Sequence, residues 1–389
     1  MSEVELAILF ESHPELLAEA EANDPSVIAE WWGSLDNGQR VSLFAGATAL
    51  VGALNGLPIL VRVAANRRNA RRILDASRQR LDTLEERREL RERVPHGGRS
   101  EETDLLRKQI AYLEQVVDGD IQLYLYQPEN DRIIELIGDP TTAKRVMSFM
   151  PGTNASLELM YDGLVDPDDP YRSGSQQEFT AWQVANGGGD LLGFVFKDGT
   201  FPQLDELVWN GPQLNGAADS IGSKYAAFHQ GLDSVGFADF PRASIEHSFG
   251  SAPAGEAEKV VDFDTRVLLA PIGMKAGWQA DPKTEYFVYA AEDDINKRFY
   301  NAHIPLPVID GLGYGFSPES GGALVVRESG IPAENEFWKG ATTVGGPVGA
   351  FVGEVWRIGD SIDHHNRIIS STDNQRVLGD VRELIRRTR

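Results

Sequence analysis

The spacing of apolar residues changes near residue 119 of the chain. Before that point, apolar positions recur every three to four residues among charged ones, which is the period of a helix. After Gly119 they alternate with polar residues or form short runs, which is typical of strands. We therefore expect an N-terminal helical region over residues 1–118 and an α/β domain over residues 119–389.

Two long helices are predicted at the end of the helical region. The first starts near residue 66, carries Arg and Glu at positions that can pair four residues apart, and stops at Pro95-His96-Gly97-Gly98. The second starts at Ser100, a favoured N-cap residue, and ends before Gly119. Residues 66–118 are thus expected to form an αα-hairpin. Its arginines are either a solvated face or a surface for a protein partner.

Alternation with a period of two after Gly119 predicts a β-hairpin. Its strands are Ile121–Tyr126 and Arg132–Ile137, joined by a turn at Pro128–Asp131. Further apolar runs alternate with helical stretches: Val146–Met150, Leu191–Phe196, Ala243–Ile245, Arg266–Ala270 and Tyr286–Ala290. This alternation predicts a mostly parallel sheet with helices on both faces. Residues 300–362, rich in Gly and Pro, are expected to form loops and short strands at the edge of that sheet.

The uncharged stretch from Val41 to Val61 allows two interpretations. Several arginines follow it, as they follow a membrane span. However, Gly52, the Asn55-Gly56 pair and Pro58 interrupt it, and such a sequence ends one helix and starts another more readily than it crosses lipid. We therefore favour two short buried helices over a membrane span.

Composition narrows the classes of function. Of 389 residues 41% are hydrophobic, so the chain can bury a sizeable core. A formal net charge of -22 repels nucleic acid and anionic lipid. The lack of cysteine excludes disulfides, thiolate metal sites and cysteine nucleophiles, which leaves serine as the leading nucleophile. The first residues are acidic and show no basic segment followed by an apolar one, so we expect a cytoplasmic protein.

The most informative motif is the run from Ala243 to Ser251, in which an apolar strand leads through Ser248 and Gly250 into a helix. This is the pattern of a nucleophile elbow, the turn that exposes the reactive serine of an α/β-hydrolase. The usual pattern is G-x-S-x-G, and Glu246 replaces its first glycine. A carboxylate at that point must either point away or be neutralised by burial.

Hydrolysis by a serine needs a base and an acid, and in this fold both follow the nucleophile along the chain. The acid is expected from Glu292-Asp293-Asp294, which follows a predicted strand. We predict Asp293, with Asp294 left open as the alternative. The base is expected near the C-terminus, where Asp363-His364-His365 precedes a final helix, and we predict His364.

An oxyanion hole needs two donors. The backbone N–H of Phe249, the residue after the serine, is the first. The loop after the strand Val146–Met150 contains Gly152, which permits a tight turn, and it offers the N–H groups of Thr153 or Asn154 as the second.

Each of these residues also has a purely structural interpretation. Ser248 is a favoured residue for capping a helix, Asp293 and Asp294 fit an ordinary helix start, and His364 and His365 fit a solvated surface. His247 is expected to pack or to hydrogen-bond within the elbow. A metal site formed by Asp360, Asp363, His364 and His365 is a weaker hypothesis, because adjacent histidines rarely face one ion. Gly187-Gly188-Gly189 lacks the context of a phosphate loop.

Several segments together resemble an actinobacterial α/β-hydrolase family catalogued as a domain of unknown function. In the hydrolase part, Met150-Pro151-Gly152-Thr153 is similar to its V-P-G-T strand end, and His247-Ser248-Phe249-Gly250-Ser251 to its G-H-S-Y-G-S elbow. Asp293 with Ile295 resembles its acid motif, and His364 its late histidine. The N-terminal matches are Trp31–Leu35, Leu54–Pro58 and Arg62–Arg67. The resemblance implies a triad of Ser248, Asp293 and His364 and names no substrate.

Two hypotheses about function follow. The first is a serine hydrolase of carboxylic esters, acyl or lipid esters included, that works through an acyl-enzyme on Ser248 and implies no metal or organic cofactor. Its partner is a small-molecule ester. The second is a catalytically impaired scaffold that serves as a protein-interaction module, which Glu246 and the charged hairpin motivate. Nucleic acid is not an expected partner of either.

Overall fold

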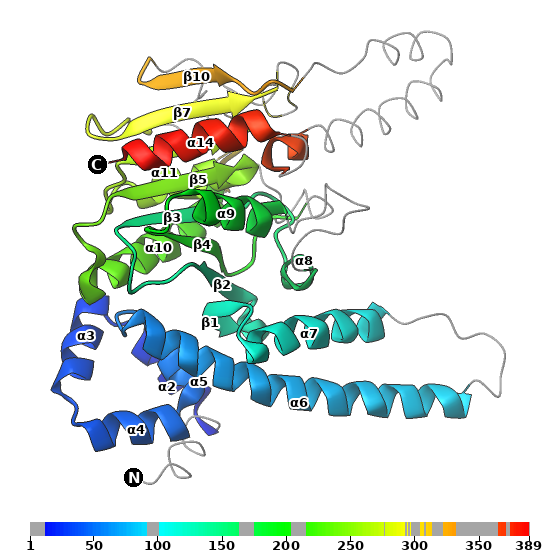
Figure 1. Cartoon of the computed structure of the whole chain (residues 1–389). Coiled ribbons are helices and arrows are strands. Elements are labelled where there is room, and N and C mark those ends of the chain that lie inside the picture. Colours follow the sequence, from blue (N-terminus) through cyan, green and yellow to red (C-terminus); the bar gives the residue numbers. More distant parts are fainter. Residues whose placement is uncertain are drawn as a thin grey trace.

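The computed structural model describes residues 12–91, 101–162, 175–203, 215–275, 277–291, 294, 296, 304–306, 309–312, 322–331, 365–370 and 374–388. Within them, short and long helices of the N-terminal region lie below a large sheet that carries helices on both faces (Figure 1). The α/β class predicted from the sequence is therefore confirmed.

Four short helices open the described chain: α2 (Pro14–Glu21), α3 (Pro25–Ser34), α4 (Asn37–Gly46) and α5 (Thr48–Ala53). Aspartate is the N-cap residue of two of these helices. Asp24 accepts from the N–H of Ser26 at α3, and Asp36 forms a reciprocal capping box with Gln39 at α4.

The uncharged stretch 41–61 is divided among α4, α5 and the first residues of α6 (Ile59–Arg91). Gly56, with φ of 100°, and Pro58 lie between α5 and α6, as the helix-breaking residues predicted. Among the described residues, no helix combines the length and the apolar character that a membrane crossing needs.

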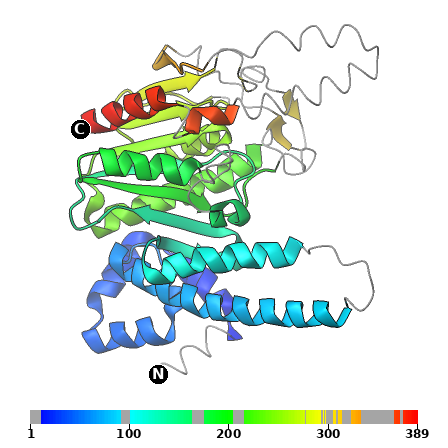
Figure 2. The ribbon, with the colours of Figure 1, turned by 45° about the vertical axis from the view of Figure 1, so that its right-hand side comes forward.

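Helix α6 packs along α7 (Glu101–Asp118), and the two extend beyond the sheet in both views (Figures 1 and 2). Exposed ion pairs such as Arg78 with Glu114 and Arg107 with Glu85 join them, in an antiparallel order. The first helix begins at Ile59 rather than near residue 66, because Pro58 starts a helix whose first turns are buried.

The predicted β-hairpin is present as β1 (Gln122–Gln127) and β2 (Arg132–Ile137). A short 3-10 turn, Pro128–Asn130, and Asp131 in the left-handed conformation connect them. The two strands pair antiparallel.

The main sheet has the order β1-β2-β4-β3-β5-β6-β7-β10. Its further strands are β3 (Arg145–Met150), β4 (Leu191–Asp198), β5 (Arg242–His247), β6 (Thr265–Leu269), β7 (Glu285–Ala290) and β10 (Leu324–Glu328). Neighbours from β4 to β10 pair parallel, and β2 alone among the eight runs the opposite way. The predicted mostly parallel sheet is confirmed. A separate short pair, β8 (Ile304–Leu306) and β9 (Ile309–Leu312), falls within the segment expected to hold loops and short strands.

Helices cover both faces of the sheet (Figure 2). On one face, α9 (Ser175–Asn186) and α14 (Gln375–Arg387) enclose a core with Phe149, Ile245 and Val381. On the other, α10 (Asn215–Leu232) and α11 (Ser251–Ala257) enclose a core with Phe194 and Tyr225. The remaining described elements are the single turn α8 (Leu157–Tyr161), a π-type turn (Asp233–Phe237) and two 3-10 turns (Ser248–Gly250 and Arg367–Ile369).

The helical region is packed directly onto the β1 side of the sheet. Ala53 of α5 and Ile59 of α6 belong to the same hydrophobic cluster as Tyr124 of β1 and Phe194 of β4. Because burial of apolar surface is the main stabilising term, helices and sheet support each other along this edge.

Candidate active site

Ser248 lies directly after the carboxyl end of β5, at the start of a 3-10 turn (Ser248–Gly250) that leads into α11. Its φ is 54°, in the left-handed region that a residue with a Cβ rarely adopts. Holding serine there costs about 1–2 kcal/mol, and such strain is concentrated at functional sites. The order of strand, strained turn and helix matches the geometry expected for a nucleophile elbow, and we call residues 247–250 the elbow below.

Two glycines allow the chain to close tightly around the elbow. A Cβ at Gly250 would come within 2.5 Å of the carbonyl oxygen of Met150, at the end of the neighbouring strand β3. A Cβ at Gly152 would come within 2.8 Å of Cβ of Ser248. The loop that follows β3 therefore lies against Ser248, where the sequence predicted an oxyanion loop.

The predicted oxyanion donors differ in their surroundings. Asn154 is left-handed, with φ of 67°, and its N–H donates to the carbonyl of Pro202 at 2.8 Å. That N–H is therefore engaged within the fold. Thr153 precedes it in the same turn, and Phe249 is fully buried one residue after Ser248.

A carboxylate and an imidazole meet beside the elbow. Nδ1 of His365 lies 2.9 Å from Oδ2 and 3.2 Å from Oδ1 of Asp294, and both side chains are buried. Burial alone raises the pKa of the Asp294 carboxyl, but the charge and hydrogen bond of His365 outweigh it and lower that pKa below its ordinary value. A carboxylate on Nδ1 is the partner that fixes the tautomer and orientation of the imidazole in a Ser-His-Asp triad.

The imidazole of His365 packs against that of His247, the residue before Ser248 at the end of β5. The centroids of the two imidazole rings are 5.0 Å apart. Burial, reinforced by the nearby charge of His365, lowers the pKa of His247 to about 3, so this ring is neutral. Its packing role agrees with the prediction for His247.

Asn296 connects the acid to the serine, and the sequence analysis missed it. Its backbone N–H donates to Oδ1 of Asp294 at 2.9 Å, and its Nδ2 lies 3.4 Å from Oγ of Ser248. The same Nδ2 donates to the carbonyl of Ala270 at the end of β6. A polar residue two positions after a strand-end aspartate was the available signal, because such spacing forms an Asx turn.

The predicted residues Asp293 and His364 lie outside the described residues. The acid and imidazole that the structure brings together are their immediate neighbours, Asp294 and His365. Asp294 was the alternative left open by the sequence. A one-residue difference cannot be read from a sequence where two acids or two histidines are adjacent, since only the backbone path decides which side chain faces inward.

Glu246 forms a buried ion pair with Arg266. Nε and Nη2 of Arg266 donate to its two carboxylate oxygens at 2.6 and 2.7 Å, and both side chains are fully buried. Burial raises the pKa of Glu246, and the charge of Arg266 opposes that rise. The carboxylate thus faces β6, and the turn at Ser248 keeps its left-handed geometry.

The network below the elbow extends to a second carboxylate. Nη1 of Arg266 donates to Glu258 at 2.6 Å, and Glu258 also accepts from Nε1 of Trp278 and the hydroxyl of Tyr286. Every charged group in this layer therefore has several polar partners.

Most of the proposed metal cluster around Asp360 lies outside the described residues. In the part of the chain that the structure describes, no group of three or more His, Asp or Glu side chains is placed to hold a metal ion. Comparison of the chain with protein-family models and with curated proteins finds no match.

Proposed function

We propose that this protein is a serine hydrolase of carboxylic esters, built on an α/β-hydrolase type of sheet, with Ser248 as nucleophile, His365 as base and Asp294 as the acid that orients it. The left-handed Ser248 at the carboxyl end of a central parallel strand is the observation that carries the proposal. The hydrogen bond between the buried side chains of Asp294 and His365 supports the roles of acid and base that we assign to them.

The proposed reaction has two halves. In the first, His365 takes the proton of Ser248 Oγ as that oxygen bonds to the ester carbonyl carbon, and the proton passes to the departing alcohol. In the second, water attacks the acyl-enzyme by the same route and releases the carboxylic acid. The N–H groups of Phe249 and Thr153 are our candidates for the oxyanion donors.

Residue-specific labelling tests the proposal. Purified protein is treated with a fluorophosphonate probe and assayed with p-nitrophenyl butyrate. We expect labelling at Ser248 and ester cleavage, both lost in Ser248→Ala and retained in Ser223→Ala, which removes an exposed hydroxyl on α10. Native protein that is neither labelled nor active would contradict the proposal and favour the scaffold hypothesis.

Adjacent residues provide matched controls for the other two roles. We expect His365→Gln and Asp294→Asn to lower kcat by at least about 100-fold, since each removes a member of the triad. His364→Gln and Asp293→Asn are expected to retain activity. The reverse pattern would restore the residues predicted from the sequence and would overturn the assignment to Asp294 and His365.

A further inference from the structure

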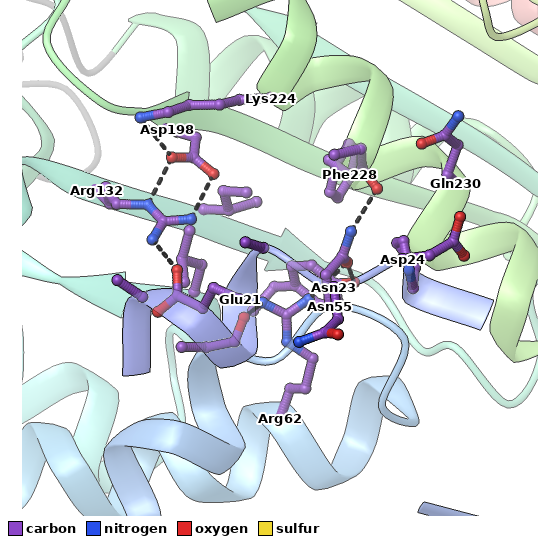
Figure 3. Close-up of a pocket in the computed structure, with 18 residues that line it drawn as sticks. Glu21, Asn23, Asp24, Asn55, Arg62, Arg132, Asp198, Lys224, Phe228 and Gln230 are labelled. Atoms are coloured by element: carbon purple, nitrogen blue, oxygen red, sulfur yellow. Dashed lines mark hydrogen bonds and ion pairs between the residues drawn. The ribbon is translucent and has the colours of Figure 1, made fainter. Parts of the chain in front are cut away.

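A cavity of about 620 Å³ lies between the helical region and the β1 side of the sheet (Figure 3). Its walls come from α2, the start of α3, the α5 to α6 connection, β1, β2, the end of β4 and α10. The volume lies in the range of sites that hold small molecules. Three strand spacings, about 14 Å, separate β2 from the elbow strand β5, so this cavity is distinct from the proposed active site.

Most of the charge in the cavity is balanced internally. Arg132 donates to both carboxylate oxygens of Asp198, at 2.6 and 3.0 Å, and also to Glu21. Lys224 lies 3.4 Å from Asp198. Figure 3 shows Arg132 between the two carboxylates. These two cations and two anions form a neutral cluster.

Two charged residues of the lining lie outside this cluster. Asp24 is exposed and caps α3 by accepting from the N–H of Ser26. The buried one is Arg62. It lines the cavity and is 2% exposed. Its hydrogen bonds go to uncharged acceptors, namely the carbonyls of Gly52 and Ala53 and the side-chain oxygen of Asn55. Its guanidinium carbon lies 3.7 Å from the ring centroid of Tyr124. The helix carbonyls and the ring stabilise the cation but do not neutralise it.

The three hydrogen bonds of Arg62 do not use all of its N–H groups. A guanidinium has five N–H groups, two on each terminal nitrogen. One bond from Nη1 goes to Asn55 and one from Nη2 goes to Ala53. A carboxylate accepts from the two terminal nitrogens of a guanidinium in a fork, which is the strongest pairing available to such a group.

We infer that this cavity binds a small organic carboxylate, with its acid group against Arg62 and its apolar part against Phe228 and the neighbouring alanines. Among the described residues Arg62 has no carboxylate among its hydrogen-bond partners, and a bound carboxylate would supply one. Glu21, Asp24 and Asp198 also line the cavity and repel a doubly charged anion such as phosphate more strongly than a singly charged one. Ala53, Ala227 and Phe228 supply the apolar surface.

Titration calorimetry of the full chain tests this inference. The probes are benzoate, its uncharged analogue benzamide and inorganic phosphate. We expect benzoate to bind at least about 10-fold more tightly than either of the others, because only benzoate combines one negative charge with an apolar ring. Equal affinity for benzoate and benzamide, or no detectable benzoate binding, would overturn the inference.

Variants assign the binding to this cavity. Arg62→Met is expected to abolish the preference for benzoate, but it also removes the bonds to the end of α5. Ala22→Phe therefore serves as the second variant, since it fills the cavity from an exposed position and deletes no hydrogen bond. We expect Ala22→Phe to weaken benzoate binding at least about 10-fold. Ala76→Phe, at an exposed position of α6, is the matched control and should bind normally. Undiminished binding to Ala22→Phe would place benzoate elsewhere and overturn the inference.

Discussion

Beneath the elbow, Arg266 lies between the carboxylates of Glu246 and Glu258, whereas on the β1 and β2 side of the sheet two buried charged residues have uncharged partners. There, Arg62 donates to carbonyl and amide oxygens, and Glu135 of β2 accepts from the hydroxyl of Tyr112 and from Gln177. Arg266 is thus held by opposite charges, whereas Arg62 and Glu135 are held by hydrogen bonds to uncharged groups.

This difference has a physical consequence. A buried ion with an opposite partner keeps its charge when conditions change, and it is costly to disturb only when the partner is removed. A buried carboxyl held by neutral groups responds to pH, because desolvation favours its uncharged form. The carboxylates below the elbow thus each face a cation, whereas on the β1 and β2 side burial raises the pKa of Glu135 to about 7 and Arg62, by our inference, binds an anion.

The largest expected effect is the loss of Arg266. Arg266→Met leaves Glu246 and Glu258 buried without a cation, so we expect a loss of roughly 3–5 kcal/mol in the free energy of unfolding at pH 7.5, measured by urea denaturation. Because the pKa of Glu246 is already raised by burial, protonation should restore part of this loss at pH 5. Arg376→Met, on an arginine that is 54% exposed, should change little. Equal losses of unfolding free energy in the two variants would contradict the special role of the buried ion pairs of Arg266.

The second effect is a pH dependence that comes from Glu135. Burial raises its pKa to about 7 from 4.5, and the bonds from Tyr112 and Gln177 oppose that rise. A raised carboxyl pKa stabilises the fold below pH 4.5, and this contribution is lost as pH rises through 7. We expect the free energy of unfolding to fall by roughly 2–3 kcal/mol more between pH 5 and pH 8 in the native protein than in Glu135→Gln. Parallel pH curves for the two proteins would show that Glu135 does not titrate in this range.

Glu246→Gln should have a smaller effect than loss of Arg266. The guanidinium keeps Glu258 at 2.6 Å, so we expect a destabilisation of roughly 1–3 kcal/mol, from one weakened pair. Since Glu246 faces Arg266 and not the serine, fluorophosphonate labelling of Ser248 should proceed at the native rate. A variant that folds normally but is no longer labelled would show that Glu246 shapes the elbow.

The smallest effect has the opposite sign. Glycine adopts positive φ without steric cost, so Ser248→Gly should stabilise the protein by about 1 kcal/mol while abolishing labelling. Asn154→Gly is the control, because asparagine tolerates its φ of 67° and the change should gain less. Thermal denaturation measures both, and a destabilised Ser248→Gly would show that the hydroxyl matters more than the strain.

Local patterns were sufficient for much of the fold. A period of two, with the turn residues at Pro128–Asp131, predicted the hairpin of β1 and β2, and short apolar runs predicted β3 to β7 within a few residues. The segment at Ser248 predicted a strand, a turn and a helix, because an apolar run that leads through serine and glycine into a helix is the pattern of a nucleophile elbow. β10 lay in the Gly- and Pro-rich segment for which only short strands were expected, since such a segment has little periodicity of its own.

Long-range contacts decided what the sequence left open. Adjacent aspartates and adjacent histidines have the same chemistry and differ only in which one faces inward, so Asp294 with His365 needed the folded backbone. The direction in which the Glu246 carboxylate points, and its charge partner, depended on Arg266, which is 20 residues away in sequence and lies on the next strand. The cavity beside Arg62 is formed by parts of helices and strands that lie between residues 18 and 230, so no single stretch of the sequence predicts it. A sequence fixes local conformation through steric and periodic preferences, while pairing between distant side chains is decided only when the elements pack.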